Sequence, residues 1–197
     1  MQLPQPLPRA TGLPPGANVS VSFRLSALPS GGLNGGNAMS VAAGDLDGDG
    51  VLDMVVANWH NYRSTSNGLL MNNGRGAFTS SELIGGWADT SAVALGDFDG
   101  DGDLDVVLGS YNAATPNKLL LNNISNHPFP SNGSFSLFDL PGAAGKTQAI
   151  AVGDVDLNGQ LDIVAVNENS NHQLLLGDGG GGFTATDLPS GPFVTSS

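Results

Sequence analysis

The sequence repeats one acidic motif three times, and this repetition limits the possible folds more than any other feature. The motif begins at Asp45, Asp97 and Asp154, so successive copies are separated by 52 and 57 residues. Each copy carries oxygen-bearing side chains at motif positions 1, 3, 5 and 9, with a glycine at position 6. A period of this length is too long for a helical-hairpin repeat and fits a four-stranded blade of a β-propeller.

Side chains at this spacing converge on one point when the loop curls tightly, and clustered hard oxygen atoms are what Ca²⁺ requires. The glycine at position 6 permits the sharp turn, and the backbone carbonyl of position 7 is expected as a further ligand. The loops contain no Cys or His, which disfavours transition metals. We therefore predict three Ca²⁺ ions, one per acidic loop. The predicted ligands are Asp45, Asp47, Asp49, Val51 and Asp53 in the first loop, Asp97, Asp99, Asp101, Asp103 and Asp105 in the second, and Asp154, Asp156, Asn158, Gln160 and Asp162 in the third.

Two other interpretations fit the loops less well. An EF-hand loop needs a bidentate Glu at position 12, where this chain has Val56, Leu108 and Ala165. A solvated acidic turn without metal would hold several carboxylates together, at a cost of about 1 kcal/mol for each close pair. The third loop has Asn158 where the others have a carboxylate, so it is expected to bind calcium more weakly.

The net charge of −12 follows from these loops, because they hold twelve of the 18 acidic residues. The remaining acids are balanced by 6 Lys and Arg, so a basic footprint for nucleic acid is missing and no nucleic-acid partner is expected. The chain has no Cys and therefore no disulfide framework. No apolar run approaches the ~18 residues of a membrane span, so no membrane span is expected in this segment.

Each repeat is predicted to form four short strands, and the fold class is therefore all-β. The first strand precedes the acidic loop and the second follows it; both are short, rich in β-branched residues and bounded by Gly or Asn. A Leu-rich third strand comes next, and the fourth opens with Phe78, Phe135 or Phe183. The predicted first strands are 41–44, 93–96 and 150–153, the second 54–57, 106–108 and 163–166, and the third 69–71, 119–121 and 174–176.

The predicted organisation is a Pro-rich linker over 1–18 followed by a partial β-propeller over 19–197. Its four-stranded antiparallel repeats cover about 38–89, 90–145 and 146–197, and residues 19–29 read as an orphan N-terminal outer strand. Three blades are fewer than the ~4 that propellers need to close. We therefore expect the segment to belong to a larger propeller, with further blades of the same chain; assembly with copies of itself is the alternative.

The Asp-x-Asp-Gly-Asp-Gly hairpins between apolar strands, followed by Leu-Leu-Leu/Met-Asn-Asn and Gly-x-Phe, resemble FG-GAP/VCBS repeats. The resemblance covers about residues 19–197. It implies an integrin-alpha-like propeller with its calcium loops on one face, in an extracellular or cell-surface protein. It also implies adhesion or recognition of a protein or glycan, with calcium stabilising the blades, and some members of the family are modules of polysaccharide-degrading enzymes.

In a four-stranded meander the end opposite the calcium loops is formed by the second-to-third and fourth-to-first connections. We hypothesise a protein or glycan contact surface there, because aromatic and Arg-rich loops make recognition surfaces. The alternative is that Trp59 and Trp87 pack between neighbouring blades. The residues predicted for this ligand face are Trp59, His60, Tyr62, Arg63, Trp87, Tyr111, Asn112 and Lys146.

Three sequons, at Asn18, Asn123 and Asn132, match the N-glycosylation pattern. His60, His127 and His172 share no repeat position and have no nucleophile pattern nearby, so no catalytic residues and no enzyme activity are expected. The leading hypothesis is an extracellular, calcium-stabilised propeller segment used in adhesion, recognition or surface assembly. The alternatives are a glycan-binding module and a non-catalytic part of a secreted polysaccharide-degrading enzyme.

Overall fold

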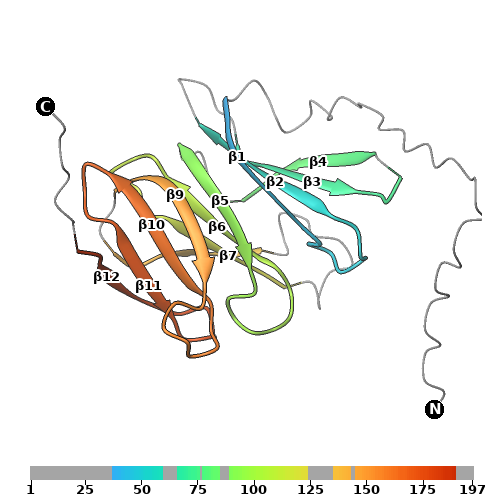
Figure 1. Cartoon of the computed structure of the whole chain (residues 1–197). Coiled ribbons are helices and arrows are strands. Elements are labelled where there is room, and N and C mark those ends of the chain that lie inside the picture. The colour runs from blue at the N-terminus through green and yellow to red at the C-terminus, as the bar shows by residue number, and fades with distance from the viewer. Residues whose placement is uncertain are drawn as a thin grey trace, which may run out of the picture.

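The computed structural model describes residues 37–59, 66–75, 77–84, 89–123, 135–142 and 145–189. Within these ranges the chain forms twelve strands and no helix, so no described segment could cross a membrane as a helix (Figure 1). The all-β prediction is confirmed. The strands are β1 (Asn37–Gly44), β2 (Asp53–Trp59), β3 (Gly68–Asn72), β4 (Phe78–Glu82), β5 (Thr90–Gly96), β6 (Asp105–Ser110), β7 (Lys118–Asn122), β8 (Phe135–Asp139), β9 (Lys146–Gly153), β10 (Asp162–Glu168), β11 (Gln173–Gly177) and β12 (Phe183–Asp187).

The strands form three four-stranded antiparallel sheets in chain order, which we call blades 1, 2 and 3. In each blade every strand pairs with the next one along the chain, as in β1-β2-β3-β4. The first and second strands pair in the same register in all three blades. The last residue of the first strand, a glycine, pairs with the aspartate that begins the second strand: Gly44 with Asp53, Gly96 with Asp105, and Gly153 with Asp162. The repeated sequence is therefore a repeated hairpin.

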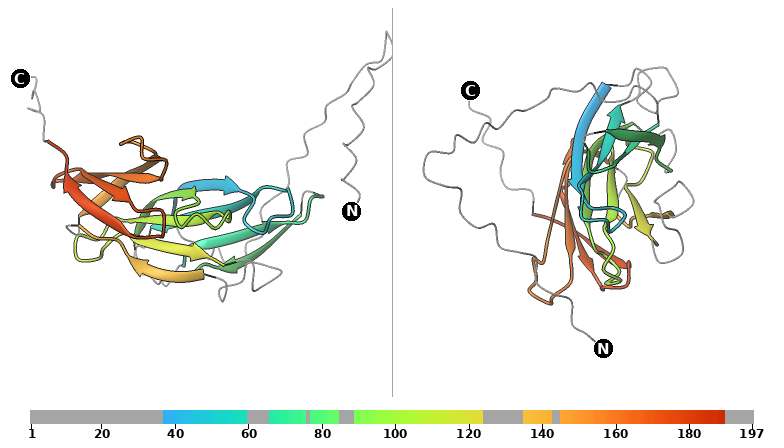
Figure 2. Two further views of the ribbon diagram at one scale, coloured as in Figure 1. Left: turned by 90° about the horizontal axis from the view of Figure 1, so that it is seen from below. Right: turned by 90° about the vertical axis from the view of Figure 1, so that its right-hand side faces the viewer.

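The blades lie side by side in chain order, and Figures 1 and 2 show blade 2 between the other two. Their first strands are nearest to one another, since β1 contacts β5 and β5 contacts β9. Each interface between blades is an apolar core of strand residues that alternate between the two faces of a sheet. The first core joins Val55 and Leu69 to Val106 and Leu120, and the second joins Val107 and Leu119 to Ile163 and Leu175.

A polar link accompanies each apolar interface. The side-chain amide of Asn67 donates to the Thr90 hydroxyl of the next blade (3.0 Å), and the Thr147 hydroxyl donates to Oδ1 of Asn117 (2.9 Å). The Oδ1 atoms of these two asparagines also accept a backbone N–H at the end of the second strand. Asn67 accepts from Asn58, and Asn117 accepts from Ser110. In blade 3 the corresponding bond goes to Nδ1 of His172. This histidine thus occupies a repeat position that the sequence did not reveal.

The first strand of every blade contains a β-bulge at the end far from the acidic loop. Pairing is regular up to Ser40, Ala92 and Ala149 and then skips one residue. The residue left out of the ladder is Met39 in β1, Ser91 in β5 and Gln148 in β9. A bulge redirects the side chain of the extra residue away from the regular pleat. The predicted linker 1–18 and orphan strand 19–29 lie outside the described residues.

Candidate metal loops and the opposite end of the blades

Each acidic loop is curled by hydrogen bonds from its own backbone to its first carboxylate. The N–H groups of Asp49 and Gly50 donate to the two oxygens of Asp45 at 3.1 and 2.8 Å. The same arrangement recurs at Asp97, which accepts from Gly100 and Gly102, and at Asp154, which accepts from Asn158 and Gly159. Backbone N–H groups at position 7 bond to the side chain at position 5 in all three loops.

This curl gathers three carboxylates in each loop with one oxygen from each lying within 4.8 Å of the others. The groups are Asp45, Asp47 and Asp53 in the first loop, Asp97, Asp99 and Asp101 in the second, and Asp154, Asp156 and Asp162 in the third. Asp49 and Asp105 are not members of these groups. A cluster of carboxylate oxygens fits a hard divalent cation, and Ca²⁺ tolerates the irregular geometry of a flexible loop better than Mg²⁺ does.

The aspartate at position 9 has a second role that the sequence did not indicate. Asp53, Asp105 and Asp162 are fully buried, and each joins its loop to the third strand of the same blade. One oxygen of Asp105 accepts from the N–H of Phe98 in the loop (2.8 Å), and the other from the N–H of Asn122 in β7 (2.7 Å). Asp53 bonds Leu46 and Asn72 in the same way, and Asp162 bonds Val155 and Gly177.

Burial and mutual repulsion raise the pKa of several of these carboxyl groups. Burial raises the pKa of Asp105 to about 7, and the neighbouring charges of Asp99 and Asp101 add to the effect, against the backbone donors that oppose it. The pKa values of Asp47, Asp53 and Asp99 are also raised, with burial as the largest cause. Ionisation of these carboxyl groups is thus disfavoured in the loops, and a bound cation would favour the ionised form.

Asp162 behaves differently, because three backbone N–H groups donate to its carboxylate. Burial acts to raise its pKa, but the backbone donors Gly177, Val155 and Asp156 together outweigh burial, and the pKa is lowered. The third loop also has Leu157 at position 4, with φ of 63°, where the other loops have Gly48 and Gly100 at 72° and 76°. A residue with a side chain is strained in this left-handed region. The weaker calcium binding expected of this loop stays a prediction.

Asn122 links two blades at the metal-loop end. Its side-chain amide donates to the carbonyl of Leu46 in the first acidic loop (2.9 Å) and to that of Leu104 (3.2 Å). Its Oδ1 is the buried side-chain atom that has no hydrogen-bond partner among the described residues. Gly181 of blade 3 similarly donates to the carbonyl of Phe98 in the second loop (3.0 Å). The first and second acidic loops thus support the next blade as well as their own.

The opposite end brings together part of the predicted ligand face. The rings of Trp59 and Tyr111 meet edge to face with centroids 6.3 Å apart, and Nζ of Lys146 lies 5.2 Å from the centre of the Tyr111 ring. Trp59 therefore packs between blades, as the alternative interpretation expected, and also lines a pocket at this end. Asn112 lies in the exposed turn that follows Tyr111. His60, Tyr62, Arg63 and Trp87 lie outside the described residues.

Sequence reasoning missed Met39, Ser91, Gln148 and Glu168 at this end. The first three are the bulge residues of the first strands, and Glu168 ends β10. Their signal was present in the repeat, since they stand at fixed distances from the acidic loops. Of the predicted glycosylation sites, Asn123 is half-buried at the end of β7, and Asn18 and Asn132 lie outside the described residues.

The described fold and loops define a class: an all-β chain of propeller-like blades, each with an acidic hairpin loop at one end. Comparison with family models identifies it further. An FG-GAP repeat model matches residues 37–68, and an FG-GAP-like repeat model matches residues 53–108. These two matches support an FG-GAP repeat protein, and such repeats are compatible with a β-propeller segment of a cell-surface or extracellular protein. Comparison with curated proteins finds no match.

Proposed function

We propose that this chain is a non-enzymatic, calcium-binding β-propeller segment of an extracellular or cell-surface protein, used in adhesion or recognition. The observation that carries the proposal is the group of three carboxylates in the acidic loop of every described blade, with one oxygen from each within 4.8 Å of the others. Side-chain oxygens at positions 1, 3, 5 and 9 and the position 7 carbonyl would hold Ca²⁺, which supplies positive charge to these sites.

Calcium in these loops would stabilise the blades by two routes. It would neutralise carboxylates whose pKa is raised by burial, such as Asp47 and Asp99. It would also stiffen the hairpin that carries Leu46 and Phe98, which are buried in the interfaces between blades. Because an ion bound only to the folded state stabilises that state by mass action, a site filled to about 100 times its dissociation constant adds about 2.7 kcal/mol.

Calorimetric titration of the metal-free chain with CaCl₂, together with thermal unfolding in EDTA and in calcium, tests the proposal. Extracellular sites bind with dissociation constants on the order of 10⁻⁴–10⁻³ M, so millimolar calcium should raise the melting temperature clearly. Asp97→Asn should remove part of this increase. Glu82→Gln, which changes an exposed acid outside the loops, is the matched control. Equal melting temperatures in EDTA and calcium would contradict the proposal.

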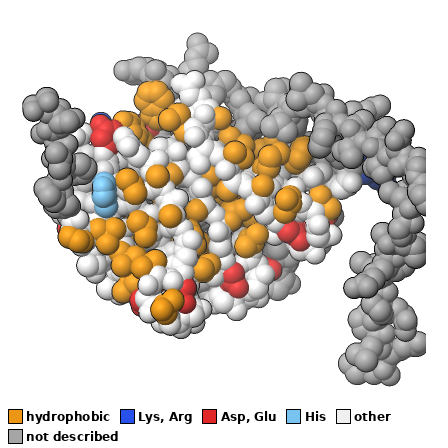
Figure 3. All heavy atoms as spheres, in the orientation of Figure 1, with side chains coloured by type: hydrophobic (Ala, Val, Ile, Leu, Met, Phe, Trp, Pro, Cys, Tyr) orange, Lys and Arg blue, Asp and Glu red, His pale blue; other side chains and the backbone are white. Residues whose placement is uncertain are grey.

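The outer face of blade 3 is covered, in the assembled protein, by a further blade of the same kind. The support is a comparison at one repeat position: Leu46 and Phe98 are 0% and 2% exposed, whereas Val155 is 52% exposed. Val166 on β10 is exposed on the same blade, and Figure 3 shows hydrophobic side chains spread over the β9–β12 sheet.

Sedimentation velocity of this chain tests what covers the face. A monomer that binds a hydrophobic dye, with less dye bound by Val166→Asp, supports a missing further blade. A dimer that Val166→Asp dissociates would show that a second copy fills the face, and would overturn the assignment to a further blade. A monomer with no dye binding would show that the face needs no cover.

A further inference from the structure

Two repeat positions supply all the described residues that line the pocket at the end opposite the acidic loops. Met39, Ser91 and Gln148 are the bulge residues of β1, β5 and β9. The second repeat position lies 14 residues after the first aspartate of each loop, at the end of the second strand or directly after it. It holds Trp59, Tyr111 and Glu168. All but Glu168 line one cavity of about 410 Å³.

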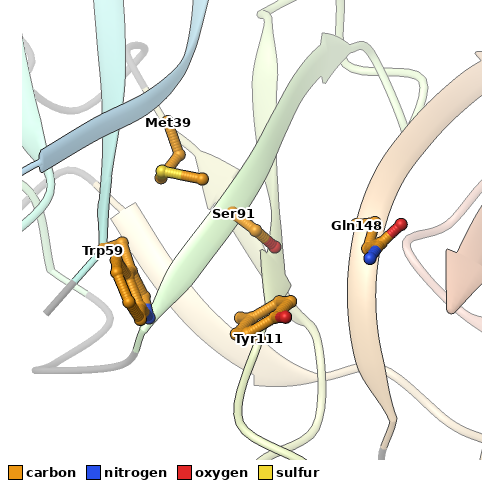
Figure 4. Close-up of a pocket in the computed structure, with 5 residues that line it drawn as sticks. All are labelled: Met39, Trp59, Ser91, Tyr111 and Gln148. Atoms are coloured by element: carbon orange, nitrogen blue, oxygen red, sulfur yellow. The ribbon is translucent and has the colours of Figure 1, made fainter. Parts of the chain in front are cut away.

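Figure 4 shows how these side chains face the cavity. Trp59 stands on one side and Gln148 on the other, with Ser91 between them and Tyr111 below. Met39 lies beside Trp59 and is 53% exposed, so the cavity opens to solvent there. Three blades thus contribute to one pocket, and the bulges direct their side chains into it.

The two repeat positions carry different residue types in each blade, although the surrounding scaffold is repeated. The bulge holds Met, Ser or Gln, and the strand end holds Trp, Tyr or Glu. The position before the bulge is Thr in blades 2 and 3, where Thr90 and Thr147 form the links between blades, and Ala38 in blade 1. Residues that vary on a repeated scaffold are free of a shared structural role, and here they combine aromatic, hydroxyl, amide and carboxylate groups.

The polar groups of the pocket are held in place by one another. The Tyr111 hydroxyl donates to Oε2 of Glu168 at 2.5 Å, and the Gln148 amide donates to the same oxygen at 3.1 Å. Lys146 lies over the Tyr111 ring and close enough to Glu168 to favour its ionised form. Glu168 and Lys146 beside the pocket carry opposite charges, and the described residues that line it are all neutral, which favours an uncharged ligand.

We propose that this pocket binds a neutral carbohydrate, with a sugar ring packed against Trp59 and Tyr111 and its hydroxyls bonded to the Gln148 amide. The negative face of an aromatic ring attracts the positively polarised C–H groups of a pyranose. The amide of Gln148 offers both a donor and an acceptor to sugar hydroxyls. A volume of about 410 Å³ lies in the range of small-molecule sites and suits one or two sugar rings better than an extended peptide.

This inference specifies the ligand class of the proposed recognition function, and it does not depend on the calcium sites. The test is a glycan array probed with the calcium-loaded chain, followed by calorimetric titration with a neutral oligosaccharide that binds. Trp59→Ala should weaken binding about tenfold or more, since it removes an aromatic wall. Gln148→Ala, at an exposed position, should weaken binding without affecting folding. Phe138→Ala, which removes an exposed aromatic residue from β8, is the matched control and should bind as the parent does.

Circular dichroism and melting temperature identify a variant that fails to fold, so Gln148→Ala decides the matter if Trp59→Ala is unstable. No binding of the parent chain to any neutral glycan would overturn the proposal. Unchanged glycan binding by folded Trp59→Ala and Gln148→Ala would also overturn it. Binding to a peptide library that Trp59→Ala abolishes would assign the pocket to protein recognition instead. A calcium-dependent melting temperature without glycan binding would support the calcium function and overturn the carbohydrate proposal. Glycan binding with a melting temperature that does not depend on calcium would support the carbohydrate proposal and contradict the calcium function.

Discussion

The two roles assigned to the acidic residues can be separated within one loop by the variants Asp162→Ala and Asp156→Asn. Asp162 accepts from the N–H groups of Val155 and Gly177 at 2.7 and 2.9 Å. Hydrogen bonds to a charged group contribute about 1.5–3 kcal/mol each, and the bond to Val155 is partly exposed. Asp162→Ala should therefore lower the free energy of unfolding by about 2–5 kcal/mol in EDTA as well as in calcium.

Asp156→Asn should behave in the opposite way. The asparagine keeps an oxygen for the N–H of Asn158, which now donates to Oδ1 of Asp156 at 3.1 Å. The variant should thus match the parent in EDTA and lose about 1.5–3 kcal/mol only in calcium at 10–100 times the dissociation constant. Urea unfolding in both buffers measures the two differences. Full stability of Asp162→Ala in EDTA would refute the role of position 9 in holding the loop to the third strand, and equal losses of Asp156→Asn in both buffers would refute the metal role.

The remaining predictions concern the fit between blades and the strain in the third loop. Asn122→Ala should destabilise the chain by about 1–3 kcal/mol, because the carbonyls of Leu46 and Leu104 lose their donor. Asn72→Ala, which removes an exposed bond, should cost less than about 1 kcal/mol. Equal losses of the two variants in urea unfolding would show that the contact between blades contributes little. Leu157→Gly should stabilise the chain by roughly 0.5–1 kcal/mol, because it relieves a positive φ at a residue that is 86% exposed. A lower urea midpoint for this variant would mean that the Leu157 side chain makes a contribution that exceeds the strain.

Local spacing was sufficient to predict most of the fold and the position of the acidic loops. A hairpin loop is closed by residues a few positions apart, so the spacing of Asp45, Asp47 and Asp53 already placed their carboxylates together. Strands of alternating or continuous apolar residues pair with their neighbours in a meander, so the order of strands followed from the order of the repeats. The predicted strands were shorter than the observed ones, because hydrogen-bond pairing extends past the apolar residues that mark a strand.

Only the tertiary structure determines the contacts that join residues of different strands and blades. Asn122 reaches the carbonyl of Leu46, which is 76 residues away, and no local pattern marks that pair. Asp162 looked like one more metal ligand, yet its burial and its bond to Gly177 in β11 also make it a brace for the sheet. The pocket of Met39, Ser91 and Gln148 arises because equivalent bulges of three packed first strands meet. Short-range geometry fixes which groups a loop presents, but packing of whole blades fixes which of those groups are buried and which meet across an interface.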